Sequence, residues 1–267
     1  MAKKVRALIL RTAGTNCDLE TAYAFKMAGA DPVLMHVNAV IEKRSVIDSS
    51  DILAIPGGFT YGDDIASGKV LANQLKNSLR NELSRFVASG RLVIGICNGF
   101  QVLVKMGFLP AVSSVPGDSI DATLSLNDSG KFESRWVYLR GPENGKCVWT
   151  RGLLPVIEMP VAHGEGKFIP KDPGVLSKLK KNGQVVFRYC DPSGNDAGYP
   201  FNPNGSVEAL AGICDPGGRI LGMMPHPERH VTYLQHPNWR RRGPKASGMG
   251  IGLEVFRSGV SFARKHL

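Results

Sequence analysis

Cys97 stands in a segment whose residue types could support a nucleophilic thiol. The run Gly95-Ile96-Cys97-Asn98-Gly99 has the glycine, nucleophile, glycine spacing of a strained turn between a strand and a helix. A thiol at a helix N-terminus faces the positive end of the helix dipole, which favours the thiolate. The alternative is an inert buried cysteine, but this context predicts that Cys97 is a reactive nucleophile.

Backbone N–H groups close to such a nucleophile could stabilise an oxyanion. Asn98 directly follows Cys97, so its N–H has the position of the usual oxyanion donor. The turn Pro56-Gly57-Gly58 ends a predicted neighbouring strand and could supply a second N–H. We therefore expect an oxyanion hole between this turn and Asn98.

His226 and Glu228 provide a candidate base and a group to orient it. Pro225 and Pro227 flank His226, and Pro227 disfavours a helical conformation at that histidine. In an extended chain, residues i and i+2 point to the same side, roughly 6.5 to 7 Å apart at Cα. The sequence thus predicts that Glu228 orients the His226 imidazole and that Cys97 completes a triad.

His163 is the competing candidate for the base. It lies in Val161-Ala162-His163-Gly164-Glu165, where a His-x-Glu pattern also occurs. Glycines surround it, so we expect a more flexible loop there and prefer His226.

The elements that must position these residues alternate between strand and helix patterns in the first half of the chain. Apolar runs predict strands at 5–10, 32–37, 51–55 and 91–96, and amphipathic spacing predicts helices at 18–28 and 69–88. Cys97 follows the fourth strand directly, and a short helix should follow Cys97 and end at Gly107. This alternation predicts an α/β fold with a mostly parallel sheet covered by helices on both faces.

The second half of the chain has weaker patterns. Strands are predicted at 135–140, 184–189 and 219–223, separated by turn-rich loops, and a terminal helix at 254–267. No repeat and no linker is visible, so we expect one domain over residues 1–267.

Charge and cysteine content limit the possible partners. The net charge is +10, but only Arg240, Arg241 and Arg242 are contiguous and no recognition motif surrounds them. An acidic protein surface is therefore a better partner than nucleic acid. The five cysteines have no disulfide or metal spacing, and no apolar run is long enough for a signal peptide or a membrane span. We expect reduced thiols, no metal, no membrane partner and a cytoplasmic location.

Several segments together resemble a known family. GICNGFQ, PGGFTYGDD and PHPE resemble the triad class of glutamine amidotransferases. GTNCDLETAYAF, PVAHGEGKF, FNPNGS and GICDPGGRILGMMPHPERH are similar to the glutamine amidotransferase subunits of phosphoribosylformylglycinamidine synthase. These segments run from about Thr12 to His230 and cover most of the chain.

The resemblance implies a flavodoxin-like three-layer fold and hydrolysis of L-glutamine to glutamate and ammonia through a Cys97 thioester. It implies that the oxyanion lies between N–H groups near Gly58 and Asn98. It also implies that Gln101 contacts glutamine, and it makes His163 and Glu165 candidates for the glutamine pocket or a subunit contact.

The resemblance also implies the destination of the ammonia. In this family a large ATP-dependent synthetase subunit uses it to convert formylglycinamide ribonucleotide to the amidine, and a small accessory subunit can take part. We expect ATP and Mg on that partner and no cofactor in this chain, which has no P-loop GxxxxGK[ST] sequence.

Residues 235–250 depart from the compact members of the family and are predicted to be an extension, similar to the domain fused to the large single-chain synthases. Two alternatives to the main hypothesis stay open. One is a thiol hydrolase that uses the same scaffold for another substrate, and the other is a non-catalytic regulatory subunit.

Overall fold

The computed structural model describes residues 4–112, 115–141, 145–243 and 248–267. The strands are β1 (Arg6–Arg11), β2 (Asp31–His36), β3 (Ile52–Ile55), β4 (Leu92–Ile96), β5 (Ala122–Leu126), β6 (Glu133–Arg140), β7 (Val156–His163), β8 (Glu165–Pro170), β9 (Val185–Cys190), β10 (Leu210–Cys214) and β11 (Ile220–Met223). The α-helices are α1 (Asp18–Met27), α2 (Val37–Glu42), α3 (Ser45–Asp48), α4 (Lys69–Ala88), α5 (Asn98–Met106), α6 (Pro173–Lys181) and α7 (Gly252–His266).

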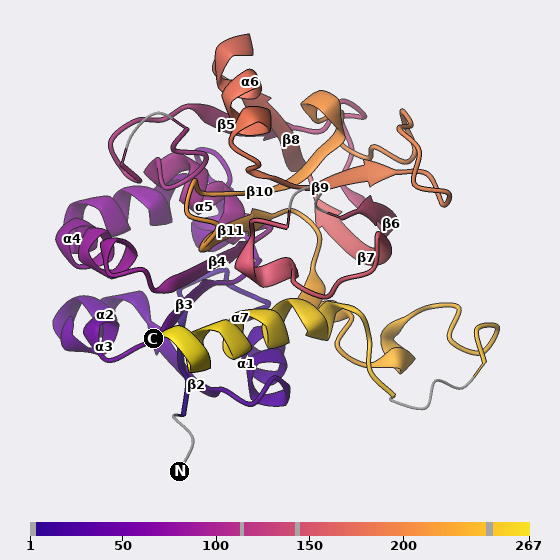
Figure 1. Ribbon diagram of the computed structural model, residues 1–267. Coiled ribbons are helices and arrows are strands. Elements are labelled where there is room, and N and C mark those ends of the chain that lie inside the picture. Colours follow the sequence, from indigo (N-terminus) through magenta and orange to yellow (C-terminus); the bar gives the residue numbers. More distant parts are fainter. Residues whose placement is uncertain (1–3, 113–114, 142–144, 244–247) are drawn as a thin grey trace.

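A nine-stranded sheet forms the centre of the molecule, in the order β2-β1-β3-β4-β11-β10-β9-β6-β7 (Figure 1). The five strands from β2 to β11 pair in parallel. Every residue of β3 and β4 is buried, as expected where helices cover both faces of a parallel sheet. The predicted α/β class and the four strands of the first half are confirmed.

Helices cover the two faces of this parallel part. In Figure 1, α4 and α5 lie on one side of the strands, and α1 and α7 lie side by side on the other. α4 has the predicted bounds and buries Leu71, Leu75 and Leu79 on one stripe. The rings of Phe25 and Phe256 join α1 to α7 with centroids 5.0 Å apart.

The other half of the sheet is antiparallel. The three strands predicted in the second half of the chain are present as β6, β9 and β11, but parts of the expected loops between them form the additional strands β5, β7, β8 and β10. β10, β9, β6 and β7 continue the sheet, and β5 and β8 form a separate pair. β7 contains Pro160, which usually argues against a strand, but β7 is the last strand of the sheet order. An edge strand tolerates proline because one of its sides has no ladder to complete.

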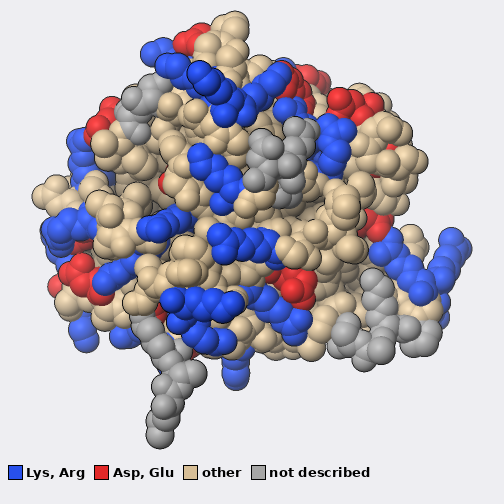
Figure 2. All heavy atoms as spheres, in the orientation of Figure 1, with Lys and Arg blue, Asp and Glu red and all other residues tan. Residues whose placement is uncertain are grey.

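Basic side chains are spread over the surface. On the face in Figure 2, Lys and Arg lie among acidic residues across the whole molecule instead of in one stripe. No helix in the described chain has the length and apolarity that crossing a bilayer requires.

The predicted extension leaves the body of the molecule after the short helix Tyr233–Gln235 (Figure 1). A bridge between Thr232 and Met249 brings the chain back before α7. Residues 244–247 of the predicted segment lie outside the described residues.

Candidate active site

Cys97 occupies the sharp turn between β4 and α5. Its backbone has φ 52° and ψ −106°, a sparsely populated conformation that costs about 1–3 kcal/mol. The flanking glycines make room for this turn, because a Cβ on Gly99 would lie 1.8 Å from the Ile55 carbonyl oxygen and one on Gly95 would lie 2.5 Å from that of Gly99. The structure thus contains the strained elbow that the sequence predicts.

His226 and Glu228 lie beneath the surface at the end of β11. The His226 Nδ1 and Glu228 Oε1 atoms are 2.6 Å apart, and both residues are 1% exposed. The His226 N–H donates to the carbonyl of Pro160 on β7, at 2.9 Å, which fixes this segment against the sheet edge.

The backbone conformation that brings His226 and Glu228 together differs from the prediction. Only His226 is extended, while Pro227–Arg229 forms a short 3-10 helix, so an extended segment through Glu228 was wrong. Proline is well suited to the first position of such a turn, because its fixed φ is close to helical. The tight turn brings the carboxylate back to the imidazole of the residue two positions earlier.

The electrostatics of His226 favour its charged form. Burial acts to lower the pKa of His226, but the charge of Glu228, the Cys97 thiol and the Cys17 thiol together raise it well above its ordinary value. The Cys97 Sγ donates to the Ala162 carbonyl at 3.6 Å, and the His226 Nε2 has no hydrogen-bond partner in the described part of the chain. The nucleophile and the base are therefore neighbours that are not yet joined by a closed hydrogen bond, as is common before substrate binds.

The two predicted oxyanion donors lie on either side of the elbow. Gly58 has φ +150°, and a Cβ there would lie 2.6 Å from the Gly14 carbonyl oxygen, so only glycine fits. The Asn98 side chain accepts from Thr60 Oγ1 at 2.7 Å and so ties α5 to the loop that follows Gly58. The backbone N–H of Gly58 has no hydrogen-bond acceptor among the described residues, and the same is true of the backbone N–H of Asn98.

Gln101 is held by protein groups in this structure. Its Nε2 donates to the Glu165 carbonyl oxygen at 2.5 Å, and its Oε1 accepts from the Asn98 side chain at 3.0 Å. The Glu165 carboxylate accepts from the Ser67 N–H at 3.3 Å. Gln101 and Glu165 therefore form one network beside Cys97.

His163 is not on a flexible loop, so that expectation was wrong. It is the last residue of β7, is 2% exposed, and pairs through Nδ1 with Asn127 Oδ1 at 3.1 Å. Because the Asn127 amide nitrogen donates to the His163 and Lys131 carbonyls, its oxygen is left to accept, and His163 Nδ1 must carry the proton. Burial, with the charge of His226, lowers the pKa of His163 to about 4, so this imidazole is neutral at pH 7.

Cys17 and Arg229 belong to the same region, although no role was predicted for either residue. The Cys17 Sγ lies 3.9 Å from His226 Nδ1 and accepts from Arg229 Nη2 at 3.0 Å. The signal was available, because Cys17 lies in one of the segments that resemble the family and Arg229 directly follows Glu228.

The donor atoms of Cys17, His226 and Glu228 lie within 4.8 Å of one another, the spacing of potential metal ligands. A cation bound there would have to displace the Arg229 guanidinium from the Cys17 sulfur and break the 2.6 Å hydrogen bond between His226 and Glu228. The donor set therefore fits a hydrogen-bonded protein cluster better than a metal site.

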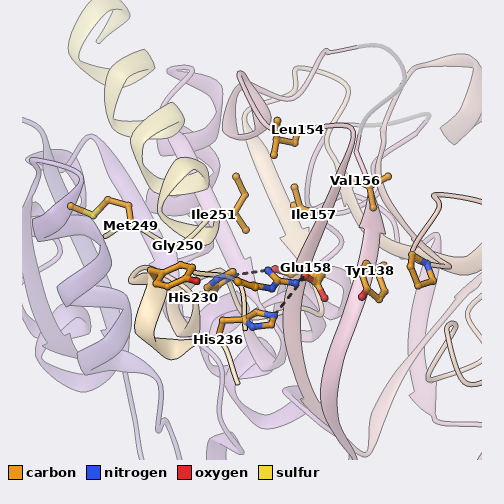
Figure 3. A pocket seen from close by; sticks show the side chains of 13 residues that line it. Tyr138, Leu154, Val156, Ile157, Glu158, His230, His236, Met249, Gly250 and Ile251 are labelled. Atoms are coloured by element: carbon orange, nitrogen blue, oxygen red, sulfur yellow. Dashed lines mark hydrogen bonds and ion pairs between the residues drawn. The ribbon is translucent and has the colours of Figure 1, made fainter. Parts of the chain in front are cut away.

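A separate cavity of about 250 Å³ lies between β7 and the segment before α7 (Figure 3). Glu158, His230 and His236 point into it, Arg242 forms an ion pair with Glu158, and the His236 Nε2 atom lies 3.6 Å from the same carboxylate. None of the predicted site residues lines this cavity.

Comparison with known proteins identifies close relatives. A protein from Dehalococcoides mccartyi named phosphoribosylformylglycinamidine synthase subunit PurQ is 47% identical over 263 residues, covering 98% of this chain and 99% of the relative. A protein of the same name from Methanococcus maripaludis is 40% identical over 270 residues, covering 97% and 98%.

Solved structures agree with these relatives. One chain of the PurLQS structure from Thermotoga maritima superposes with a TM-score of 0.73 and 30% identity, covering 97% of this chain and 99% of that one. A glutamine amidotransferase from the same organism shares the fold, with a TM-score of 0.55, at 13% identity and a coverage of 99% and 100%.

The family match covers both the turn at Cys97 and the buried His226–Glu228 pair. Residues 4–263 match the family described as CobB/CobQ-like glutamine amidotransferase domain. With that match over nearly the whole sequence, the chain belongs to the CobB/CobQ-like glutamine amidotransferase family, among the relatives named phosphoribosylformylglycinamidine synthase subunit PurQ.

Proposed function

We propose that the chain releases ammonia from L-glutamine with Cys97, His226 and Glu228 and passes it to a separate ATP-dependent synthetase. That synthetase converts formylglycinamide ribonucleotide to formylglycinamidine ribonucleotide in de novo purine biosynthesis. The observation that carries the proposal is a cysteine at a strained strand-to-helix turn beside a buried His–Glu pair, in a chain of this family.

The first half of the reaction forms a thioester. The Cys97 thiolate attacks the side-chain amide carbon of glutamine, and the N–H groups of Gly58 and Asn98 donate to the oxyanion that develops. His226, in its charged form, gives its Nε2 proton to the amide nitrogen, and the C–N bond breaks to release ammonia. Cys97 is left as a glutamyl thioester.

The second half returns the enzyme to its starting state. His226, now neutral, takes a proton from water, and the hydroxide attacks the thioester carbon. The C–S bond breaks, glutamate leaves, and the thiolate forms again beside the imidazolium. Glu228 keeps the imidazole in one tautomer throughout and stabilises its charge.

The network beside Cys97 is the proposed recognition site for the amino-acid end of glutamine. Gln101 and the Glu165 main chain are fixed to each other, and the Glu165 carboxylate accepts a hydrogen bond from the Ser67 N–H. A carboxylate in this position suits the ammonium group of an amino acid. Neutral, buried His163 then supports the strand end against which Cys97 lies.

We also propose that the chain itself needs no metal or cofactor and that ATP and Mg act on the partner. The cluster of Cys17, His226 and Glu228 is poorly suited to a cation, because the Arg229 guanidinium already donates a hydrogen bond to the Cys17 sulfur. This supports a chain without a metal at that position. Similarity to a chain of the PurLQS structure supports a complex with a large synthetase subunit and a small accessory subunit. Five free thiols support a cytoplasmic location.

The test compares glutamine with ammonia as nitrogen donor. In the complex with the synthetase, Cys97→Ala should abolish glutamine-dependent synthesis and leave ammonia-dependent synthesis intact. A glutamine-derived diazo-ketone should label Cys97 in the unchanged protein and nothing in the variant. If the variant loses both activities, Cys97 has a structural role, and if it loses neither, the proposal is wrong.

The two alternatives predict other outcomes of the same test. A thiol hydrolase for another substrate would be labelled by general alkylating agents but not by the glutamine analogue. A regulatory subunit would keep full glutamine-dependent synthesis in the Cys97→Ala complex.

A further inference from the structure

We propose that Cys17 and Arg229 are positioning residues of the active site, which hold the His226–Glu228 pair and balance its charge. This inference rests on the proposed function, because it concerns the same histidine. It assigns a role to two residues on the side of His226 that faces away from the nucleophile.

Cys17 lies behind the catalytic imidazole, at the nitrogen that Glu228 holds. Its side chain is 0% exposed, and its Sγ is 3.9 Å from His226 Nδ1. The thiol donates to the Asn16 Oδ1 at 3.1 Å and accepts from the Arg229 guanidinium at 3.0 Å. The sulfur is thus fixed from two sides and packs against the ring.

The same cysteine is joined to the oxyanion turn. The Cys17 N–H donates to the Gly57 carbonyl at 3.2 Å, and Thr15 forms a bridge with Gly58. A Cβ on Gly57 would lie 2.7 Å from His226 Cε1 and 3.3 Å from the Cys17 Sγ. Cys17 therefore sets the spacing between the oxyanion turn and the imidazole in addition to contacting the ring.

Arg229 supplies the charge that the buried site lacks. In the reactive form, the thiolate and the Glu228 carboxylate are negative and only the His226 imidazolium is positive, so the triad has one excess negative charge. Glu228 is 1% exposed, and its Oε2 has no hydrogen-bond partner in the described chain. Water cannot stabilise that charge, and an unbalanced buried charge is costly.

The Arg229 guanidinium interacts electrostatically with Glu228. Burial acts to lower the pKa of Arg229, but Cys17, Glu228 and Glu20 more than offset it and raise the pKa. His163, on the opposite element β7, is neutral at pH 7 and adds no charge. Arg229 thus brings the charge of the triad to zero, and the Cys17 sulfur holds the guanidinium in place.

Cys17 must stay protonated for this arrangement to work. Burial raises the pKa of Cys17, and the negative charge of Glu228 adds to that effect. The thiol therefore acts as a neutral donor and acceptor, and Cys97 remains the nucleophile. A serine hydroxyl has the same two hydrogen-bonding functions, whereas alanine has neither.

The test uses paired variants in the complex with the synthetase. Arg229→Gln removes the charge and Arg229→Lys keeps it, while Cys17→Ala removes both hydrogen bonds and Cys17→Ser keeps them. Cys190→Ala is the matched control, because Cys190 is also 0% exposed and lies beside Arg140, away from the triad. Glutaminase kcat and KM, the rate of Cys97 alkylation by iodoacetamide and the melting temperature are measured for each.

We expect Arg229→Gln and Cys17→Ala to lower kcat on the order of 10- to 100-fold, the usual effect of losing a hydrogen bond to a charged group. The KM for glutamine should change less than threefold, because neither residue lies on the Cys97 side of the ring. Alkylation of Cys97 should slow in parallel, and Arg229→Lys and Cys17→Ser should recover most of the loss. Cys190→Ala should match the unchanged protein.

Two results would overturn the inference. One is a kcat for Arg229→Gln and Cys17→Ala equal to that of Cys190→Ala. The other is a loss of activity that follows the melting temperature, raises KM and is not recovered by the conservative variants. If the unchanged complex has no glutaminase activity at all, the proposed function fails first, and the inference with it.

Discussion

Glu228 is the residue on which the charge distribution of the site depends. It lies 2.6 Å from the ring nitrogen of His226, the proposed base, and its carboxylate is enclosed by protein. A buried acceptor of this kind has two effects. It fixes the imidazole tautomer, and its negative charge stabilises the imidazolium in a region of low dielectric constant.

Replacement of Glu228 by Gln tests both effects. The amide keeps nearly the same shape but lacks the charge and can present the wrong hydrogen-bonding group to Nδ1. We expect kcat for glutamine to fall on the order of 10³- to 10⁴-fold with a small change in KM, the pattern seen when a triad carboxylate becomes an amide. Ammonia-dependent synthesis by the complex should be unaffected.

Glu254→Gln is the matched control for that variant. Glu254 lies on α7, is 37% exposed and pairs with Arg257 three residues later. The same substitution there should leave both activities unchanged, and a similar fall in the two variants would contradict the assigned role of Glu228.

His163 makes a prediction about stability because its pKa is lowered to about 4. The unfolded chain takes up a proton at this histidine below about pH 6.5, whereas the folded chain does not until about pH 4. The folded state therefore loses roughly 3 kcal/mol between pH 6.5 and pH 4 from this residue. The free energy of unfolding therefore decreases as the pH is lowered through this range, because protons bind preferentially to the unfolded chain.

The measurement compares urea unfolding of the unchanged protein and His163→Asn from pH 7 to pH 4. Asparagine keeps a donor for Asn127 but does not titrate. The difference in unfolding free energy between the two proteins should shrink as pH falls, by roughly 3 kcal/mol at the lower limit. A difference that is the same at every pH would show that His163 is not the titrating group.

At the scale of elements, the strand-to-helix turn explains why the nucleophile can be strained and yet stable. β4 is held between β3 and β11, and α5 starts with its backbone against the end of β3. The contact distance there leaves no space for a side chain on Gly99. The elbow is consequently set by packing between elements rather than by local preference.

Gly99→Ala should therefore displace the start of α5. We expect a loss of about 1–3 kcal/mol in unfolding free energy from overpacking, together with a large loss of glutaminase activity because Cys97 and the Asn98 N–H move with the helix. Gly198→Ala is the control, because a Cβ there meets nothing within 4 Å. Equal midpoints of urea unfolding for the two variants would contradict this account of the elbow.

The elements that the sequence predicted well are those whose signal is local. α4 has a long apolar stripe, and β4 is an apolar run beside a glycine-flanked cysteine, so both could be placed from neighbouring residues alone. β7 and β10 were missed because Pro160 and Gly212 interrupt their strand patterns, although both pair with a strand that is next to them in the sequence. The tight turn at Glu228 was missed for another reason, since the segment before it is held by the distant Pro160 carbonyl.

The candidate site shows the same division. Cys97, His226 and Glu228 could be proposed as site residues from residue types and spacing alone. Cys17 is 209 positions before His226, and no local pattern links them. Its position beside His226 follows from the parallel order of β1, β3, β4 and β11, which brings the carboxyl ends of these strands together.

At the scale of the whole molecule, the enclosed triad has a consequence for the ammonia that it produces. Cys97, His226 and Glu228 are 5%, 1% and 1% exposed, so ammonia forms below the surface. Ammonia released to bulk water near pH 7 is protonated and no longer nucleophilic. A site of this depth is useful to a partner synthetase when the ammonia passes directly to it and does not mix with solvent.

This makes an isotopic prediction for the assembled complex. With glutamine labelled at the amide nitrogen and a tenfold excess of unlabelled ammonium salt, the product should keep nearly all of the label, because ammonia formed at the buried triad should reach the synthetase before it mixes with the external ammonia. The Cys97→Ala complex, given labelled ammonium instead, should incorporate the label freely and so serve as the control for access to the synthetase. Dilution of the label in proportion to the ammonium present would show that the two sites exchange through bulk water, in which case the depth of the triad serves only the thioester chemistry.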